Sequence, residues 1–127
     1  MQSERPHKKL IVWQEGIELA RLCYEISILL PSDEKFGLGS QLKRASISVP
    51  ANIAEGAARK TQKEFLYFLY VSSGSLSEVD TLNELMKTLN FINDESYSLL
   101  KNKVDKVSAL LNGLISSKSR NNYDHKS

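Results

Sequence analysis

The stretch 61–90, TQKEFLYFLYVSSGSLSEVDTLNELMKTLN, decides the fold of this chain. It opens with a capping box, Thr61-x-x-Glu64, in which the hydroxyl can accept from one free amide of a new helix and the carboxylate from another. After the box, apolar or small residues recur at a 3-4-3-4 spacing: Phe65, Phe68, Ser72, Ser75, Val79, Leu82, Met86 and Leu89. A repeat of about 3.5 residues predicts a helix over 62–90 that packs nearly antiparallel on its neighbours.

Three other segments share this helical periodicity, so we expect helices over about 10–30, 37–59, 62–90 and 94–117. Pro31 ends the first, because the residue before a proline resists the helical conformation. The inward positions predicted for the first helix are Leu10, Trp13, Ile17, Ala20, Tyr24 and Ile28, and those for the last are Tyr97, Leu100, Val104, Val107, Leu111 and Leu114. Short connections predict an all-α, antiparallel up-down-up-down four-helix bundle, with residues 1–8 and 118–127 as flexible tails.

Length and composition are those of one globular domain over 1–127. The chain has 127 residues, of which 41% are hydrophobic and 25% charged, enough for one modest core. The single cysteine, Cys23, allows neither an internal disulfide nor a zinc site of its own. The chain begins without a signal peptide, and no apolar run approaches the roughly 18–20 residues that span a bilayer. We expect a cytoplasmic protein without a membrane partner.

Enzyme motifs are missing from the sequence. His7 and His125 lie outside all four predicted helices, so the Glu-x-x-His metal motif of di-iron bundles cannot form. The glycines of Gly37-Leu38-Gly39-Ser40 lack the Gly-Lys-Ser/Thr that completes a phosphate-binding loop. No nucleophile, histidine and acid can be combined in the body of the chain. We expect no catalytic residues, no cofactor, no metal and no enzyme activity.

The second helix is unusual because it is apolar on two sides. One stripe contains Leu38, Leu42, Ala45, Val49, Ile53 and Gly56, and a second, roughly opposite, contains Ile47, Ala51, Ala54 and Ala58. Such a helix is usually covered on both sides, which makes the second stripe a candidate subunit interface. The alternative is an exposed alanine face, since alanine is the best helix former. Pro50 removes a backbone donor and crowds the carbonyl of Ser46, which predicts a bend or local break near 46–50.

A polar stripe runs between the two apolar ones. It consists of Gln41, Arg44, Ser48, Asn52, Glu55 and Arg59. Arg44 and Arg59 could bind phosphate. The alternative is a structural network in which Glu55 pairs with Arg59 one turn later. The network is favoured for Glu55 and Asn52, and both interpretations stay open for the two arginines. In the third helix, Ser72-Ser73-Gly74-Ser75 predicts close approach of another backbone.

The chain is mildly basic, with a net charge of +2 and a pI of about 8.6. Its basic residues form three groups: Arg5, Lys8 and Lys9; Lys43, Arg44, Arg59, Lys60 and Lys63; and Lys101, Lys103, Lys106, Lys118 and Arg120. The middle group brackets the junction of the second and third helices and supplies the nucleic-acid-binding candidates. Symmetric assembly would repeat a weak basic patch and strengthen its field.

Short motifs in the second and third helices resemble a known family. They are Phe36-Gly37-Leu38, Ser40-Gln41, Arg44-Ala45, Ser48-Val49-Pro50, Asn52-Ile53-Ala54-Glu55-Gly56, Arg59, Glu64-Phe65, Phe68-Leu69 and Gly74-Ser75-Leu76. Together they resemble the 23S rRNA intervening-sequence protein family of bacterial four-helix-bundle proteins, over about 10–114. The chain departs from the family at Glu78-Val79-Asp80, where Glu-Leu-Glu is frequent, and at Ala51, where serine is common.

The resemblance implies an antiparallel four-helix bundle that assembles as a homopentamer and has no enzymatic activity. It marks motif residues of structural importance: Gln41, Ser48, Pro50, Asn52, Glu55, Gly56, Gly74 and Ser75. Some family members are encoded within insertions in large-subunit rRNA genes. A related branch, the accessory variability protein of diversity-generating retroelements, binds nucleic acid and a reverse transcriptase.

We therefore expect a non-enzymatic homo-oligomer, a pentamer by resemblance, that binds RNA or DNA weakly through Lys and Arg to phosphate. Its expected partners are further copies of itself, RNA or DNA, and a reverse transcriptase. The alternative is a protein–protein adaptor or structural subunit with no role in nucleic-acid binding, whose charges only keep it in solution.

Overall fold

The computed structural model describes residues 5–126, with side chains to residue 120, and it is almost entirely helical. The short 3-10 helix η1 (Pro6–Lys9) precedes α1 (Ile11–Ser27). A 3-10 turn, η2 (Ser32–Glu34), and a π-helical turn, η3 (Lys35–Gly39), lead into α2 (Ser40–Ala57). The chain continues as α3 (Gln62–Thr88) and α4 (Asp94–Lys126). The predicted all-α fold of four helices is confirmed.

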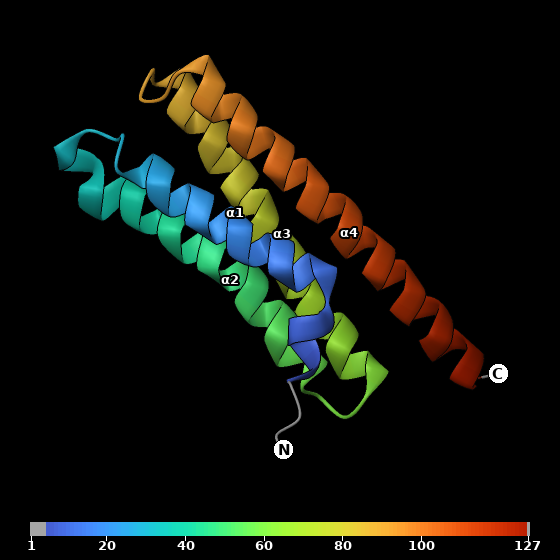
Figure 1. The fold of residues 1–127 in the computed structure, drawn as a ribbon. Coiled ribbons are helices and arrows are strands. Elements are labelled where there is room, and N and C mark those ends of the chain that lie inside the picture. Colours follow the sequence, from blue (N-terminus) through green and yellow to red (C-terminus); the bar gives the residue numbers. More distant parts are fainter. Residues whose placement is uncertain (1–4, 127) are drawn as a thin grey trace.

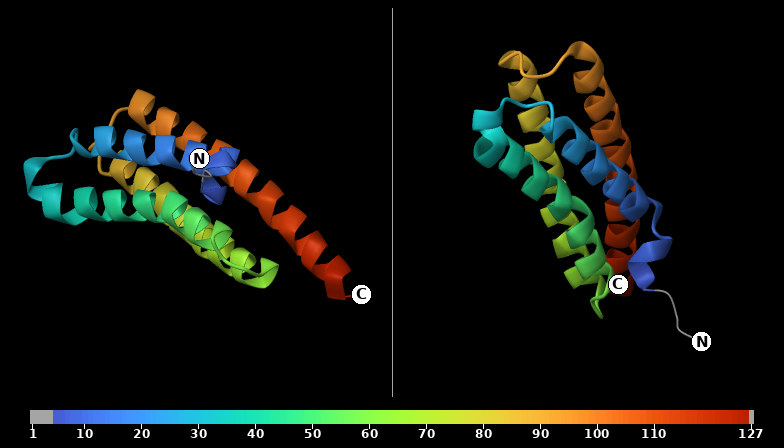
Figure 2. Two further views of the ribbon diagram at one scale, coloured as in Figure 1. Left: turned by 60° about the horizontal axis from the view of Figure 1, so that its bottom comes forward. Right: turned by 60° about the vertical axis from the view of Figure 1, so that its left-hand side comes forward.

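The four helices form a bundle in which α1 packs on α2 and α4, and α3 packs on α2 and α4. Successive helices run in opposite directions along the bundle (Figures 1 and 2). The α2–α3 turn, η1 and the N-terminal side of α1 therefore lie at one end, while the α1–α2 and α3–α4 connections lie at the other (Figure 1). No helix in the described part of the chain combines the length and apolar character that crossing a membrane requires.

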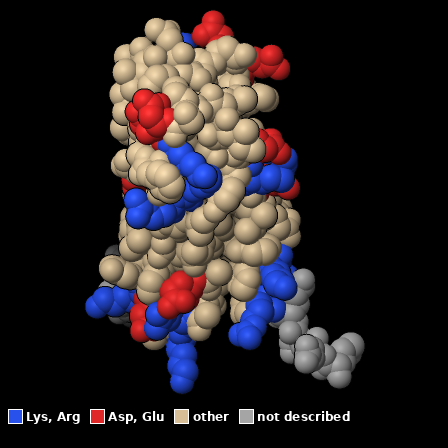
Figure 3. Space-filling model, turned by 90° about the vertical axis from the view of Figure 1, so that its left-hand side faces the viewer, with Lys and Arg blue, Asp and Glu red and all other residues tan. Residues whose placement is uncertain are grey.

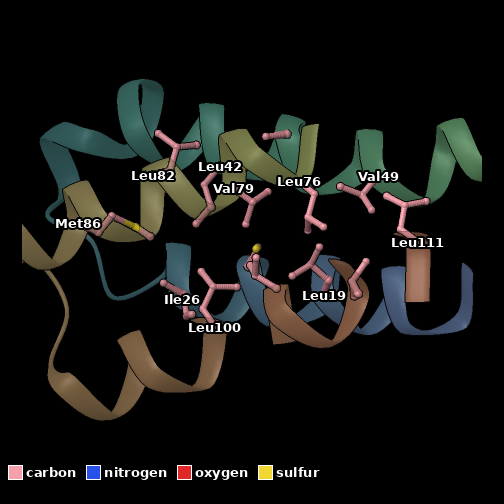
Figure 4. Close-up of a cluster of buried hydrophobic side chains, with 14 of the residues drawn as sticks. Leu19, Ile26, Leu42, Val49, Leu76, Val79, Leu82, Met86, Leu100 and Leu111 are labelled. Carbon is pink, nitrogen blue, oxygen red and sulfur yellow. The ribbon is translucent and has the colours of Figure 1, made fainter. Parts of the chain in front are cut away.

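One apolar core runs the length of the bundle and takes side chains from every helix. Leu19, Leu42, Val79 and Leu100, one from each helix, are fully buried, and the close-up in Figure 4 shows them pointing into the same space. Burying each such side chain contributes roughly 1.5–3 kcal/mol to folding. The inward positions predicted for the second and fourth helices lie in or against this core.

The predicted inward face of the first helix is correct only at its start, where Leu10 and Trp13 pack against the core, and is wrong further along. Ile17, Tyr24 and Ile28 are exposed, Ile28 by 82%, and α1 buries a neighbouring stripe instead. That stripe consists of Val12, Gly16, Leu19, Cys23 and Ile26. The segment carries two overlapping apolar stripes, and the one with small residues packs inward because α2 approaches closely. A Cβ on Gly16 would lie 3.2 Å from the Cβ of Pro50.

Pro50 is accommodated inside α2, which continues without interruption from Ser40 to Ala57. The predicted local break is therefore wrong, and the bend stays a prediction. The proline ring is buried against Gly16 of α1. Because glycine has no side chain there, the ring packs on the neighbouring backbone, and this contact helps to offset the lost backbone hydrogen bond.

The helices differ from the predicted bounds mainly at the termini. The last helix does not end near residue 117 as predicted, because α4 continues to Lys126, and Ser127 lies outside the described residues. Lys118 packs over the ring of Phe65, which ties α4 to α3 past the predicted end. At the other terminus, Pro6–Lys9 forms η1 instead of a flexible tail, while residues 1–4 lie outside the described residues.

Candidate nucleic-acid interface

The contact between α2 and α3 is made by small side chains, and it positions the basic residues at its end. Gly56 faces the first turns of α3, where a Cβ would lie 2.9 Å from both Phe65 Cδ1 and Phe68 Cβ. Further along, Ser72 Oγ donates to the backbone oxygen of Val49 at 2.8 Å. The two helices are thus held close from the turn towards the middle of the bundle.

The polar stripe of α2 is largely a structural network. Asn52 Nδ2 donates to the backbone oxygen of Ser48 at 2.8 Å and to its hydroxyl at 2.9 Å. The Ser48 hydroxyl lies 2.7 Å from that of Ser75. Gln41 Nε2 donates to Glu78 Oε2 at 3.3 Å. The last two bonds join α2 to α3, and the Asn52 amide is engaged within α2, as the network interpretation expects.

The predicted close approach in the third helix is made by its serines and not by its glycine. Ser72 and Ser75 contact α2, whereas no neighbouring atom lies within 4 Å of a Cβ built on Gly74. Gly74 faces outward, about a third of a turn away from the contact with α2. Within the single chain no neighbour approaches Gly74, and the role predicted for this residue stays a prediction.

Two phenylalanines of α3 lie beside cations, one from the α2–α3 turn and one from α4. The guanidinium of Arg59 lies 4.8 Å from the ring centroid of Phe68, and the ammonium of Lys118 lies 5.3 Å from that of Phe65. Arg59 also pairs with Glu55 one turn earlier, as predicted for these two residues. The ion pair and the ring fix the orientation of the guanidinium and leave its exposed edge for a ligand.

These cations are part of a basic end of the bundle, formed around the α2–α3 turn. Its residues come from η1, which packs on α2, from the turn itself and from α4. They are Arg5, Lys8, Lys9, Arg59, Lys60, Lys63 and Lys118. Lys and Arg side chains predominate at the lower end of the face in Figure 3. The carboxylates nearby are engaged: Glu55 with Arg59, and Glu64 with the hydroxyl of Thr61 at 3.1 Å.

The opposite end of the bundle carries charges of both signs, and Lys35 lies in its α1–α2 connection. Asp33 and Glu34 lie in the α1–α2 connection, and Asp94 and Glu95 begin α4. Asp and Glu side chains lie at the upper rim of Figure 3. The basic end, where cations from several elements gather, carries a positive field larger than the small net charge of the chain suggests.

The fold divides the predicted nucleic-acid candidates into two places. Arg59, Lys60 and Lys63 lie at the basic end, but Lys43 and Arg44 lie about 22 Å away along α2. Lys8, Lys9 and Lys118, assigned by sequence to separate groups, join the first three. Sequence reasoning missed this convergence because spacing along a chain does not say which helix ends meet.

Neither a cluster of metal ligands nor a reactive thiol is found in the part of the chain that the structure describes. Among the described residues, no His, Cys, Asp and Glu side chains gather as metal ligands would. Burial raises the pKa of the Cys23 thiol to about 12, so the thiol stays protonated and acts as a core group.

Comparison with known proteins places the chain in a family. The family model for the 23S rRNA-intervening sequence protein matches residues 8–113. The chain belongs to this family. The resemblance of its sequence motifs is thereby confirmed, and the match covers the bundle from η1 to the middle of α4. The function of the 23S rRNA-intervening sequence protein family is unknown.

A solved structure has the same fold as this chain. It is a protein with unknown function from the S23 ribosomal protein family of Bacteroides thetaiotaomicron VPI-5482. The two align with a TM-score of 0.76 and 23% sequence identity, over 84% of this chain and 96% of the other. No curated protein matches the chain.

Proposed function

We propose that the chain is a non-enzymatic protein that binds RNA or DNA through the basic end of its bundle. The observation that carries this proposal is the convergence of Lys8, Lys9, Arg59, Lys60 and Lys63 with residues of α4 around one turn. Binding is directed to phosphate, because Lys and Arg supply charge and hydrogen-bond donors without reading bases.

The state of these side chains supports the proposal. Lys60 and Lys63 are exposed, and no carboxylate of the described residues lies within ion-pair distance of either. Their ammonium groups are free to replace the counterions of a polyanion. Arg59, held by Glu55 and Phe68, loses little conformational freedom when it binds a phosphate.

The test is titration of a labelled structured RNA at low and moderate salt. A double variant, Lys60→Gln with Lys63→Gln, should weaken binding and reduce the dependence of log K on log salt by about one for each phosphate that the variant no longer neutralises. The matched control, Lys101→Gln with Lys106→Gln, removes the same charge from the middle of α4. Absence of binding by the unmodified protein at low salt, or equal effects of the two double variants, would overturn the proposal.

We also propose that the protein is a homo-oligomer, a pentamer by family resemblance, assembled through the second apolar stripe of α2. In the single chain, Ala51 and Ala58 are exposed, Ala54 is half-buried and Ile47 is 45% exposed. The bundle itself therefore leaves this stripe uncovered. Ala54→Glu should reduce the mass measured by light scattering and leave helicity unchanged. Ala109→Glu, at an exposed site of α4, is the control, and an unchanged mass for Ala54→Glu would contradict the interface.

A protein–protein adaptor is the second candidate function. Tyr67, Tyr70 and Val71 are exposed together on α3, and exposed aromatic residues are frequent in protein interfaces. The partner class suggested by the resemblance is a reverse transcriptase. Retention of such a partner after nuclease treatment, and its absence with Tyr67→Ala, would favour the adaptor; release of the partner on nuclease treatment would argue against it.

A further inference from the structure

A second group of cations surrounds a hollow at the far end of α2. The hollow has a volume of about 290 Å³ and lies between α1, η3 and the first turns of α2. Its walls carry two aromatic residues, Tyr24 and Phe36, three cations, Lys35, Lys43 and Arg44, and the apolar side chain of Ile47. The volume is near the lower end for small-molecule sites, roughly 300–1,000 Å³.

The aromatic rings of the hollow are presented to solvent. Phe36 is 87% exposed and Tyr24 is 44% exposed. Phe36 sits in the π-helical turn η3, which is held in place because Glu34 Oε1 accepts from the backbone nitrogen of Leu38 at 3.4 Å. Gly39 closes the same turn, where a Cβ would lie 3.2 Å from the backbone oxygen of Glu34. Single π-helical turns are frequent at functional sites.

Each ring has a cation beside it. Lys43 Nζ lies 5.2 Å from the ring centroid of Tyr24, and Lys35 Nζ lies 5.6 Å from that of Phe36. Arg44 borders the same hollow. No carboxylate of the described residues lies within ion-pair distance of these three cations. Flat apolar rings next to unpaired cations match the two parts of a nucleotide, its base and its phosphate.

We propose that this hollow binds an unpaired nucleotide of a single strand, with the base stacked on Phe36 or Tyr24 and the phosphate held by Lys43 and Arg44. The base displaces the flexible lysine from the ring face, and the ammonium remains within reach of the phosphate. A duplex cannot use this site, because its base faces are already stacked. The proposal takes its class of ligand from the proposed nucleic-acid binding and adds a second, strand-selective site about 22 Å from the basic end.

The test compares a labelled single-stranded oligodeoxythymidine with a duplex of the same number of phosphates. Removal of one stacked base weakens binding about fivefold to a hundredfold. Phe36→Ala should therefore weaken binding of the single strand at least about fivefold and leave duplex binding unchanged. Because the ring of Phe36 is exposed, its removal should not disturb folding. A helix content equal to that of the unmodified protein checks this. Leu99→Ala, which truncates an exposed apolar side chain of α4 outside the hollow and the basic end, is the control and should change neither affinity.

Several outcomes would overturn this site. Equal weakening of single-strand and duplex binding in Phe36→Ala would remove the strand selectivity, and no weakening of either would remove the stacking. If Phe36→Ala lowered the oligomeric mass and left the affinity for the single strand unchanged, a second copy of the chain would be the occupant of the hollow. Thymidine monophosphate binding as tightly as the oligonucleotide would assign the hollow to a free nucleotide.

The two proposals can fail separately. If the unmodified protein binds the duplex but not the single strand, the hollow is excluded and the basic end is not. If Lys60→Gln with Lys63→Gln leaves duplex binding intact while Phe36→Ala abolishes single-strand binding, the basic end is excluded and the hollow is supported. Binding of neither probe at low salt excludes both.

Discussion

The contact of α2 with α3 and the contacts of α4 with the rest of the bundle are built differently. Between α2 and α3, Gly56, Ser72 and Ser75 let the helices approach closely. In contrast, α4 is attached by large apolar side chains such as Leu100 and Leu111, and by charged groups at its margin, where Lys103 Nζ lies 2.9 Å from Glu15 Oε1 of α1.

The two contacts should therefore be sensitive to different substitutions. A close contact through small residues has no space for an added methyl group, whereas longer side chains and surface ion pairs adapt. The rigid α2–α3 pair also carries Arg59, Lys60 and Lys63 at its turn, so the most sterically constrained part of the bundle presents the proposed nucleic-acid site.

Gly56→Ala should have the largest effect. The new Cβ would meet Phe65 Cδ1 and Phe68 Cβ at 2.9 Å, and the backbone oxygen of Phe65 at 3.2 Å. We expect the free energy of unfolding to fall by about 1–3 kcal/mol, measured by urea denaturation with helicity as the signal. Gly113→Ala in α4, where nothing lies within 4 Å of the new Cβ, is the control. Equal stability of the two variants would contradict the comparison.

Ser72→Ala removes the buried hydrogen bond from Ser72 Oγ to the backbone oxygen of Val49. We expect the free energy of unfolding to fall by about 1 kcal/mol, because that oxygen is left without this partner in a place that water does not reach. Urea denaturation gives the value, and Ser77→Ala, an exposed position of the same helix, should change it little. An unchanged free energy of unfolding in Ser72→Ala would mean that side-chain packing, and not this hydrogen bond, holds the two helices together.

Gly74→Ala should act in the opposite direction to Gly56→Ala. Its Cβ meets no neighbouring atom within 4 Å, so alanine gains helix propensity without a clash. The free energy of unfolding should rise by about 0.5–1 kcal/mol, seen as a higher urea midpoint. A lower midpoint would show that another backbone approaches Gly74 in the assembled protein.

Glu15→Gln tests the attachment of α4 and should have the smallest effect. The hydrogen bond from Lys103 holds the pKa of Glu15 below its ordinary value, and Lys106 Nζ, 3.3 Å away, adds to this. A lowered pKa stabilises the fold at pH values above the ordinary one, and that contribution is lost as the pH falls through the lowered pKa.

At neutral pH, Glu15→Gln should therefore lower the free energy of unfolding by about 0.2–0.5 kcal/mol, and the difference from the unmodified protein should vanish in acid. Denaturation curves across the pH range give both values. Glu25→Gln, which breaks an exposed pair with Arg21, should cost less. A cost of Glu15→Gln that persisted in acid would assign it to packing and not to charge.

Local sequence rules predicted the helices that have a capping signal at their start or a regular spacing of apolar residues. Thr61 accepts from the backbone nitrogen of Glu64 at 3.2 Å, so the hydroxyl half of the capping box is confirmed. Val79 and Val107 lie in the core as their spacing predicted. The face of α1 was missed, because Ile17 and Tyr24 form an apolar stripe as regular as the buried one, and only the close approach of Pro50 to Gly16 distinguishes the two.

The sequence by itself determined four helices, the family and the buried faces of α2 and α4, because periodicity is a local property of the chain. Three features required the folded chain: the stripe of α1 that packs inward, the cations that meet at the basic end, and the hollow that both Phe36 and Tyr24 line. Those features join residues from different helices. They depend on how closely the helices approach one another and on which helix ends are neighbours. The spacing of residues along one helix determines neither of these.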